Sequence, residues 1–342
     1  MHDEPQRKGD LQSLTDGTLT ESDARTLLER MRWPDGLICP LADCGGSGAY
    51  RIQVAGKTLK SGRVVGPRQL FKCKACKRQF SVTKGTIFED SKIPLRAWLT
   101  VMYRMCSSKK GVSARQIGRE FGLTPESAWF MCHRVRYAMT DKNPTRLKGI
   151  VEADETYVGG KLRGHPKHRA AKFDMAERIR QARANKIAVF GIKERGGRVR
   201  AQAIPEISQR KVEKVLHDNI DPAETRLMTD EHAFYYWIKN RVPHEVIRHV
   251  SEYVRGEVHT QGMESFWAVL KRGLIGTYHH VDAGYLNQYV QEFAFRANTR
   301  RISDNERFTS LVANVGGRVD WYLGKKAQVS QPVETDEPYD LA

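Results

Sequence analysis

The sequence predicts a mixed α/β protein made of several structural units, and three observations support this class. Residues 39–76 hold two close cysteine pairs among short β-prone runs, and residues 91–140 have the apolar spacing of helices. From Gly149 onward, strand-like and helix-like segments alternate. A chain of 342 residues is also longer than one minimal domain. We therefore expect five parts: a leader with a helix (1–35), a cysteine-rich unit (36–90), a helical unit (91–145), an α/β unit (146–302) and a C-terminal extension (303–342).

The charge of the chain indicates a polyanionic partner. The formal net charge is +17, although residues 329–342 contain four acids and no lysine or arginine. Such an excess is typical of proteins that bind nucleic acid, and charge alone leaves a generally basic soluble protein as the alternative. No stretch approaches the roughly 20 apolar residues of a membrane span, and the first residues lack a signal-peptide core. We expect a cytoplasmic protein that associates with the nucleoid.

The cysteine-rich unit predicts a zinc site. Two close pairs flank a hairpin-sized segment, namely Cys39 with Cys44 and Cys73 with Cys76. Two such pairs can supply four thiolates to a tetrahedral Zn²⁺, although four residues separate the first pair where two are usual. Disulfides are the alternative, and a cytoplasmic location disfavours them. Cys106 and Cys132 lie on apolar helical faces, where we expect buried small hydrophobic residues.

Residues 113–136 have the form of a helix-turn-helix. Ser113 begins a first helix, Gly122 allows the turn, and Thr124 with Pro125 begins a second helix. An exposed second helix of this kind enters the DNA major groove, whereas a helical hairpin used as a spacer is the alternative. The side chains that we expect to face DNA are Arg115, Ser127, His133, Arg134 and Arg136.

Two basic segments are further candidates for contact with DNA phosphates. One is residues 161–186, which we interpret as a basic loop after the first strand of the α/β unit. For both segments a solvated basic surface is the alternative. The other is the hairpin between the cysteine pairs, with Lys57, Lys60, Arg63, Arg68, Lys72, Lys74, Lys77 and Arg78.

Beyond Gly149, the pattern predicts a strand, a β-hairpin, and then helices and strands in alternation. Residues 194–197 form the hairpin turn. Residues 303–328 have no clear pattern. The expected strands are 150–158, 187–193, 198–204, 226–230 and 245–249, and the expected helices are 208–218, 231–241, 263–274 and 284–301.

Three acidic residues in this unit predict a site for divalent cations. Asp154 lies within one strand-like run, Asp230 ends another, and Glu264 begins an amphipathic helix. Lys271 follows Glu264 by two helical turns on the same face, where it can hold a phosphate. A strand carboxylate, a hairpin, a second strand carboxylate and a helical glutamate occur in the order of an RNase H-like core. Three carboxylates from distant segments suit two Mg²⁺ or Mn²⁺ ions in phosphoryl transfer.

Four sequence runs resemble the zinc-ribbon DDE transposases of bacterial insertion sequences, a group related to the eukaryotic Merlin elements. The similarity extends from about Trp33 to Arg301. It implies an RNase H-like domain that cleaves DNA at terminal inverted repeats and joins the 3′-hydroxyl to target DNA, and that acts as a homo-oligomer on DNA. The runs are Phe80–Trp98, Glu152–Lys161, Glu264–Gly273 and Glu292–Arg300.

The resemblance implies that Asp154 and Asp230 are the first two metal ligands. Relatives often have His-Thr-Asn before the glutamate, and some assign the third position to that asparagine. Here the run is His259-Thr-Gln-Gly-Met-Glu, so Gln261 takes the place of the amide. We expect Glu264 to be the third ligand, because a carboxylate binds a hard cation better than an amide.

The remaining expectations concern single residues and alternative functions. His259 either positions a phosphate or water near the metals or is a partly buried structural histidine, and Arg272 is a candidate DNA contact. Trp267 is expected in the core. A non-catalytic DNA-binding regulator and an RNase H-like nuclease are the alternatives to a transposase.

Overall fold

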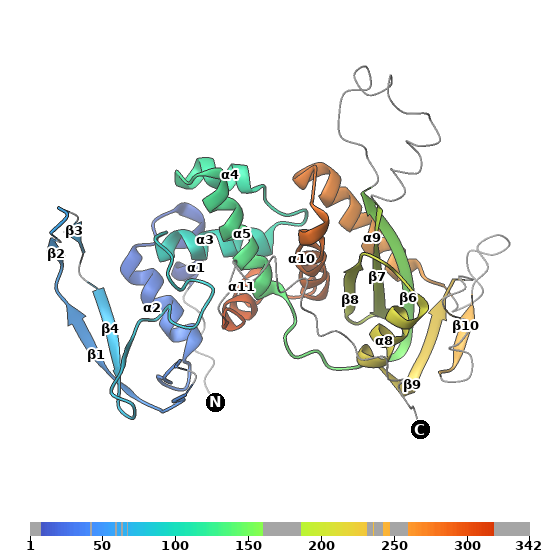
Figure 1. Ribbon diagram of the computed structural model, residues 1–342, viewed down its shortest axis with the longest axis horizontal. Coiled ribbons are helices and arrows are strands. Elements are labelled where there is room, and N and C mark those ends of the chain that lie inside the picture. The colour runs from blue at the N-terminus through green and yellow to red at the C-terminus, as the bar shows by residue number, and fades with distance from the viewer. Residues whose placement is uncertain are drawn as a thin grey trace, which may run out of the picture. The chain divides into compact units, whose positions relative to one another are not determined.

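A computed structural model describes residues 8–317 apart from 42, 59, 63, 67, 160–185, 231–234, 236–241 and 247–258 (Figure 1). The chain forms two compact units. One contains the residues up to Thr100 together with those from Thr309 onward, and the other contains Val101–Phe308. Sheets and helices are both present, which confirms the mixed α/β class. No helix in the described ranges is long and apolar enough to span a bilayer.

The first unit joins two helices to a small antiparallel sheet. α1 (Lys8–Asp16) and α2 (Glu21–Arg32) precede β1 (Ala49–Val54), β2 (Lys57–Thr58), β3 (Val64–Val65), β4 (Arg68–Cys73) and β5 (Gln79–Phe80). The strand order is β1-β4-β5, and β2 pairs with β3. Thr20 caps α2 by accepting a hydrogen bond from the Asp23 amide. After α2, Trp33 packs edge-on against Phe71 and Phe80, so the small sheet has its own aromatic cluster.

The next helices are α3 (Leu95–Ser107), α4 (Ala114–Phe121) and α5 (Pro125–Met139). The expected turn between α4 and α5 is confirmed, because Gly122 adopts a φ of 61° that favours glycine. Thr124 caps α5 by accepting from the Ser127 amide, and Pro125 opens the helix. Ser113 lies at the start of α4, but its side chain makes no capping hydrogen bond.

The second unit contains a five-stranded sheet with the order β10-β9-β6-β7-β8. β6, β7 and β8 are antiparallel to their neighbours, whereas β9 is parallel to β6 and β10 is parallel to β9. Every strand expected in this unit is present, and only residue 235 of the helix expected at 231–241 lies within the described ranges. The bounds are β6 (Leu147–Gly159), β7 (Lys186–Glu194), β8 (Val199–Ile204), β9 (Ile220–Thr229) and β10 (His244–Val246).

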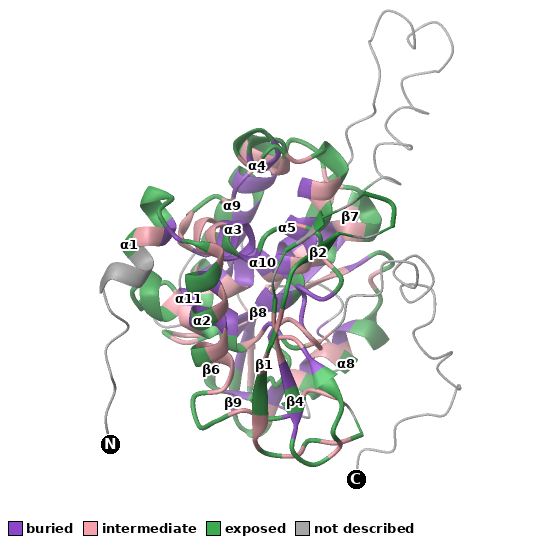
Figure 2. Ribbon diagram, turned by 90° about the vertical axis from the view of Figure 1, so that its left-hand side faces the viewer, coloured by how far each residue is buried: buried purple, intermediate pink, exposed green. Residues whose placement is uncertain are grey.

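Helices cover both faces of this sheet (Figure 1). α8 (Gln209–Asn219) packs on one face through the buried Val212 and Leu216, and Figure 2 shows exposed residues along the same helix. α9 (Gln261–Gly273) and α10 (Leu286–Asn298) pack on the other face through residues such as Trp267 and Phe293. The helices expected at 208–218, 263–274 and 284–301 are therefore confirmed. The last of them, α10, begins two residues later and ends three residues earlier than expected.

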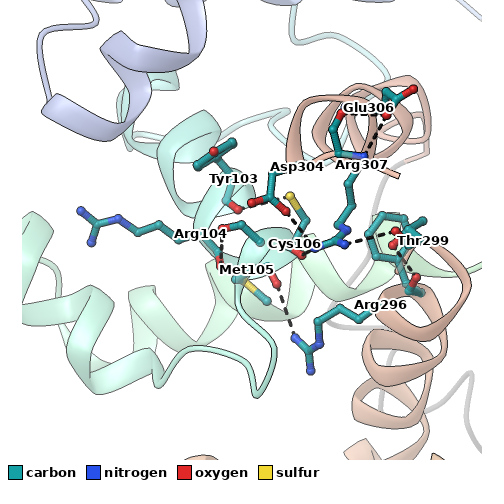
Figure 3. Close-up of polar contacts among 12 residues, drawn as sticks. Tyr103, Arg104, Met105, Cys106, Arg296, Thr299, Asp304, Glu306 and Arg307 are labelled. Carbon is teal, nitrogen blue, oxygen red and sulfur yellow. Dashed lines mark hydrogen bonds and ion pairs between the residues drawn. The ribbon is translucent and has the colours of Figure 1, made fainter. Parts of the chain in front are cut away.

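Two arginines fasten the end of α3 to the C-terminal helices of the second unit (Figure 3). Arg296 of α10 donates to the Met105 carbonyl at 3.4 Å, and Arg307 donates to the Cys106 carbonyl at 3.0 Å. Arg307 belongs to α11 (Asp304–Ala313), a helix within residues 303–328, for which the sequence has no clear pattern. Guanidinium groups suit these positions, because the last carbonyls of a helix accept no hydrogen bond from the helix itself and carry partial negative charge.

Candidate active site and zinc site

The parallel pairing of β6 with β9 brings Asp154 and Asp230 together. The last paired residues are Glu152 and Met228, and continuing this register by two residues places Asp154 near Asp230, the first residue after β9. The charge of Asp230 accordingly acts on Asp154. Asp154 occupies the middle of β6, between β9 and β7. The strand therefore holds it rigidly in the centre of the sheet. The first two acids of the predicted metal site are neighbours in the structure.

Trp267 of α9 fixes the Asp154 side chain. Its indole Nε1 donates to Asp154 Oδ2 at 2.9 Å, while the Glu155 amide donates to Oδ1 at 2.8 Å. Trp267 is buried, as expected, and also reaches Gly191 of β7. A Cβ at Gly191 would lie 2.7 Å from the indole, so glycine permits this close approach of α9 to the sheet.

The electrostatics of this region disfavour ionised carboxylates unless a cation is present. Burial raises the pKa of Asp154 to about 7, and the charges of Glu155 and Asp230 add to the shift, although the Trp267 hydrogen bond opposes it. Burial and Asp230 likewise raise the pKa of Glu155 to about 7. A divalent cation at this place would offset the repulsion among three neighbouring acids.

Glu264 and Lys271 lie on the exposed edge of α9 beside Trp267. They are about 20° apart around the helix axis, and both lie within about 60° of Trp267. Among the residues that the structure describes, the one group of three or more potential ligands with all atoms within 4.8 Å is a cysteine group. Asp154, Asp230 and Glu264 therefore do not all lie within that distance of one another in the described part of the chain.

Sequence reasoning did not identify Glu155, Tyr235 or Glu152. Glu155 points to the opposite face of β6 from Asp154, where the buried Tyr235 hydroxyl donates to it at 3.0 Å. Glu152 is also buried, and it contacts the start of α9. The available signal was the presence of two further acids among the apolar residues of a predicted central strand, since charged residues are seldom buried without a partner.

The four expected cysteines converge in the first unit. Their sulfur atoms all lie within 4.8 Å of one another, with 3.9 Å between Cys39 and Cys76 and 3.7 Å between Cys44 and Cys73. A tetrahedral zinc ion with Zn–S bonds of about 2.3 Å requires S···S distances of about 3.8 Å. Hydrogen bonds from Arg78 lower the pKa of Cys76 to about 6, which favours its thiolate, whereas burial raises the pKa of Cys39 to about 12, so a bound cation would be needed to hold Cys39 as a thiolate. The arrangement fits a zinc ion.

The two other cysteines are buried, as expected. Burial raises the pKa of the Cys106 thiol to about 12 and that of Cys132 to about 11. Both therefore remain neutral thiols in apolar surroundings. They act as small hydrophobic side chains.

The expectation that His133 and Arg136 are exposed for DNA contact is wrong. Their exposed fractions are 0% and 1%, because α5 packs against α10. His133 contacts Gln288, and Arg136 Nε donates to Glu292 Oε2 at 2.7 Å. Each of these side chains is used for packing between helices, so neither can enter a DNA groove in this structure.

The other expected DNA contacts differ in accessibility. Arg115 is exposed, and Ser127 and Arg134 are half-buried. Arg272 is exposed on α9, and His259 is half-buried beside Glu152. Arg63 and the basic loop at 161–185 lie outside the described residues. The remaining basic residues of the zinc-unit hairpin are all exposed, namely Lys57, Lys60, Arg68, Lys72, Lys74, Lys77 and Arg78.

Comparisons with known proteins agree with this organisation. Residues 19–79 match a transposase zinc-ribbon domain, and residues 146–298 match an ISXO2-like transposase domain. The chain is also 28% identical over 301 residues to an uncharacterised protein in the transposable element ISH50 of Halobacterium salinarum. That alignment covers 86% of this chain and 96% of the relative. The chain therefore contains a transposase zinc-ribbon domain followed by an ISXO2-like transposase domain.

Proposed function

We propose that the protein is a DDE transposase that cleaves DNA at the ends of an insertion sequence and joins the freed 3′-hydroxyl to target DNA. The proximity of Asp154, in the middle of β6, to Asp230, which directly follows the parallel strand β9, carries this proposal. They lie within the ISXO2-like transposase match. The similarity to a protein of a transposable element, over 86% of this chain, supports the same class of reaction.

The architecture supports an RNase H-like core. Three antiparallel strands are followed by two strands parallel to the first, and the first acid lies on the central strand. Helices cover both faces, and α9, which carries Glu264 in its first turn, contacts the strand that holds Asp154 through Met263 and Trp267. This is the order of elements that the acids themselves predicted.

The residues present fit divalent cations. Carboxylates are the ligands that Mg²⁺ and Mn²⁺ prefer, and the pKa of Asp154 is raised first by burial and then by the charges of Glu155 and Asp230, so a bound cation would favour its ionised form. Asp154, Asp230 and Glu264 would hold two such ions, which supply activation of the attacking water or hydroxyl and stabilisation of the leaving oxygen. Trp267 orients Asp154 through its indole N–H. Lys271 holds a phosphate of the DNA by its charge.

The first unit and the α4–α5 pair are assigned to DNA binding. Four thiolates at tetrahedral spacing would hold a zinc ion, which fixes the cysteine loops and orients the exposed basic hairpin. Arg115, Ser127 and Arg134 remain as candidate contacts on α4 and α5, with Arg272 and His259 near the catalytic helix. We infer that copies of the chain assemble on DNA as a homo-oligomer in the cytoplasm, at the nucleoid, because two element ends must be processed together.

Strand cleavage and joining of an oligonucleotide duplex test the proposal. The substrate should carry the inverted repeat that flanks the gene, with Mg²⁺ or Mn²⁺ present. A transposase cleaves at the repeat end and joins that end to a second duplex, and Asp154→Asn and Asp230→Asn abolish both steps. Binding without cleavage would indicate a regulator, and cleavage without repeat preference or joining would indicate a nuclease. The DNA sequence beside the gene supplies an independent check, since short inverted repeats are expected there.

A further inference from the structure

We propose that Glu152 is a positioning residue that anchors the first turn of α9 to the strand that carries Asp154. The proposal rests on the function assigned above, because α9 carries both Glu264 and Gln261, the two candidates for the third metal ligand. It assigns a role to a buried acid that neither the metal site nor the DNA surface uses. The anchor would set the distance between the third ligand and the two aspartates.

The Glu152 carboxylate contacts the start of α9 directly. Its Oε2 accepts a hydrogen bond from the Met263 amide at 3.0 Å, a donor shared with the Thr260 carbonyl at 2.9 Å. Met263 immediately precedes Glu264. The first amides of a helix lack the acceptor four residues earlier and carry partial positive charge, so an acidic side chain from another element stabilises this end. The Thr260 side chain does not cap the helix, which leaves this role to Glu152.

The other carboxylate oxygen ties the anchor to the chain that leads into α9. Arg195 Nη2 donates to Glu152 Oε1 at 3.3 Å and to the His259 carbonyl at 3.2 Å. His259 Nδ1 lies 3.5 Å from the same carboxylate oxygen. Arg195 is itself held against β6, because its amide donates to the Ile150 carbonyl at 2.8 Å. Arg195 therefore bridges β6 and His259, two residues before α9.

The backbone around the anchor is shaped for close contact. Lys193 Nζ of β7 donates to the Gly262 carbonyl at 2.9 Å. A Cβ at Gly262 would lie 2.5 Å from Glu152 Oε2 and 3.0 Å from Lys193 Nζ. Since both neighbours are fixed by hydrogen bonds, a side chain at Gly262 would displace the helix or break the anchor.

Strand geometry links the anchor to the metal site. Glu152 and Asp154 are two residues apart on β6, so their side chains point to the same face of the sheet. Asp154 accepts from Trp267 and Glu152 accepts from Met263, four residues earlier on the same helix. Two acids of one strand thus hold two successive turns of α9. Glu264 lies between those two points of attachment.

The substitutions Glu152→Ala and Glu152→Gln in the full-length protein test the anchor. Alanine removes both acceptors, whereas glutamine keeps one acceptor for the Met263 amide without the charge. Glu224→Ala is a matched control, because Glu224 of β9 forms an exposed 2.8 Å ion pair with Lys148 near the start of β6, the strand that carries Glu152. Hydrogen exchange of residues 260–270, compared with 186–194 in β7, reports the position of α9 without any assay of activity.

The anchor predicts that Glu152→Ala increases exchange in the first turns of α9 by about tenfold or more, with less than about twofold change in β7. In strand cleavage, the Mn²⁺ concentration for half-maximal rate should rise about tenfold, while saturating Mn²⁺ restores most of the maximal rate. Glutamine should give an intermediate effect, and Glu224→Ala should match the wild type in both measurements.

Two results would overturn the proposal. One is unchanged exchange in α9 for both Glu152 variants. The other is an equal increase in α9 and β7, because Glu152 would then be a general core residue. If the alanine variant does not fold, the glutamine variant decides by the same criteria. If the wild-type protein cleaves no DNA, the proposed function fails, whereas the exchange result still decides whether Glu152 anchors the helix.

Discussion

The buried ion cluster between α5 and α10 gives a quantitative prediction for stability. Glu292 is fully buried, and it accepts from Arg136 Nε at 2.7 Å, from Arg296 Nη1 at 2.5 Å and from the Tyr278 hydroxyl at 2.7 Å. Within the described residues of this cluster, Glu292 is the one negative charge paired with the buried guanidinium groups of Arg136 and Arg296. The substitution Glu292→Gln removes that charge. Loss of one partner of a buried ion pair costs about 3–5 kcal/mol. We expect the free energy of unfolding of this unit to fall by that amount.

Urea unfolding followed by circular dichroism measures this loss. Glu245→Gln is the matched control, because Glu245 of β10 pairs with Arg226 of β9 at a half-exposed position on the five-stranded sheet of the second unit. A pair of that kind contributes about 0–1 kcal/mol. The reasoning is refuted if the urea midpoint of Glu292→Gln shifts no further than that of Glu245→Gln.

The same cluster predicts a dependence of stability on pH. Burial alone would raise the pKa of Glu292, but Arg296, Arg136 and the Tyr278 hydroxyl outweigh it and lower the pKa from 4.5 to about 2. A carboxyl group with a depressed folded pKa stabilises the protein above its unfolded pKa. Its contribution is complete above about pH 4.5 and is lost as the pH falls through 2. Urea midpoints at pH 6 and pH 3 should therefore differ less in Glu292→Gln than in the wild type.

Three further predictions concern DNA, metal and zinc. Arg136→Ala should lower the urea midpoint, whereas Arg115→Ala should leave it unchanged. In fluorescence anisotropy of DNA binding, Arg115→Ala should reduce the slope of log Kd against log salt by about 1. An unchanged slope would exclude a contact between Arg115 and a DNA phosphate. Trp267→Phe removes the donor to Asp154 and should raise the Mn²⁺ requirement of cleavage up to about tenfold, and an unaltered requirement would contradict that role. Cys73→Ser should remove about one zinc ion per chain and the spectroscopic signal of the folded first unit. A full zinc content of this variant in elemental analysis would disprove the site.

Local sequence signals predicted most of the elements of the second unit. The apolar run around Asp154 indicated β6, and the Gly-Gly turn after Glu194 indicated the β7–β8 hairpin. Gly122 and Thr124 marked the boundary between α4 and α5, because one supplies the left-handed backbone and the other caps the helix. These features depend on residues close together in the chain. They can therefore be recognised without the rest of the fold.

Long-range packing limited the prediction of side-chain roles. His133 and Arg136 are residue types that commonly contact DNA, so the sequence favoured an exposed position for them. In the structure they are covered by α10, which lies more than 150 residues later in the chain. Glu152 was overlooked for a similar reason, since its partner Met263 lies 111 residues away. The pairing of Asp154 with Asp230 was predicted from the order of the elements. The position of Glu264 depends on how α9 docks, which sequence spacing does not determine.

Mn²⁺ binding to the wild type, Asp154→Asn, Asp230→Asn and the double variant tests the central claim most directly. If the two aspartates hold the same ions, each single substitution should weaken binding nearly as much as the double substitution, because either loss disrupts the shared site. Wild-type affinity in either single variant would contradict the account. Independent and additive losses would contradict it as well.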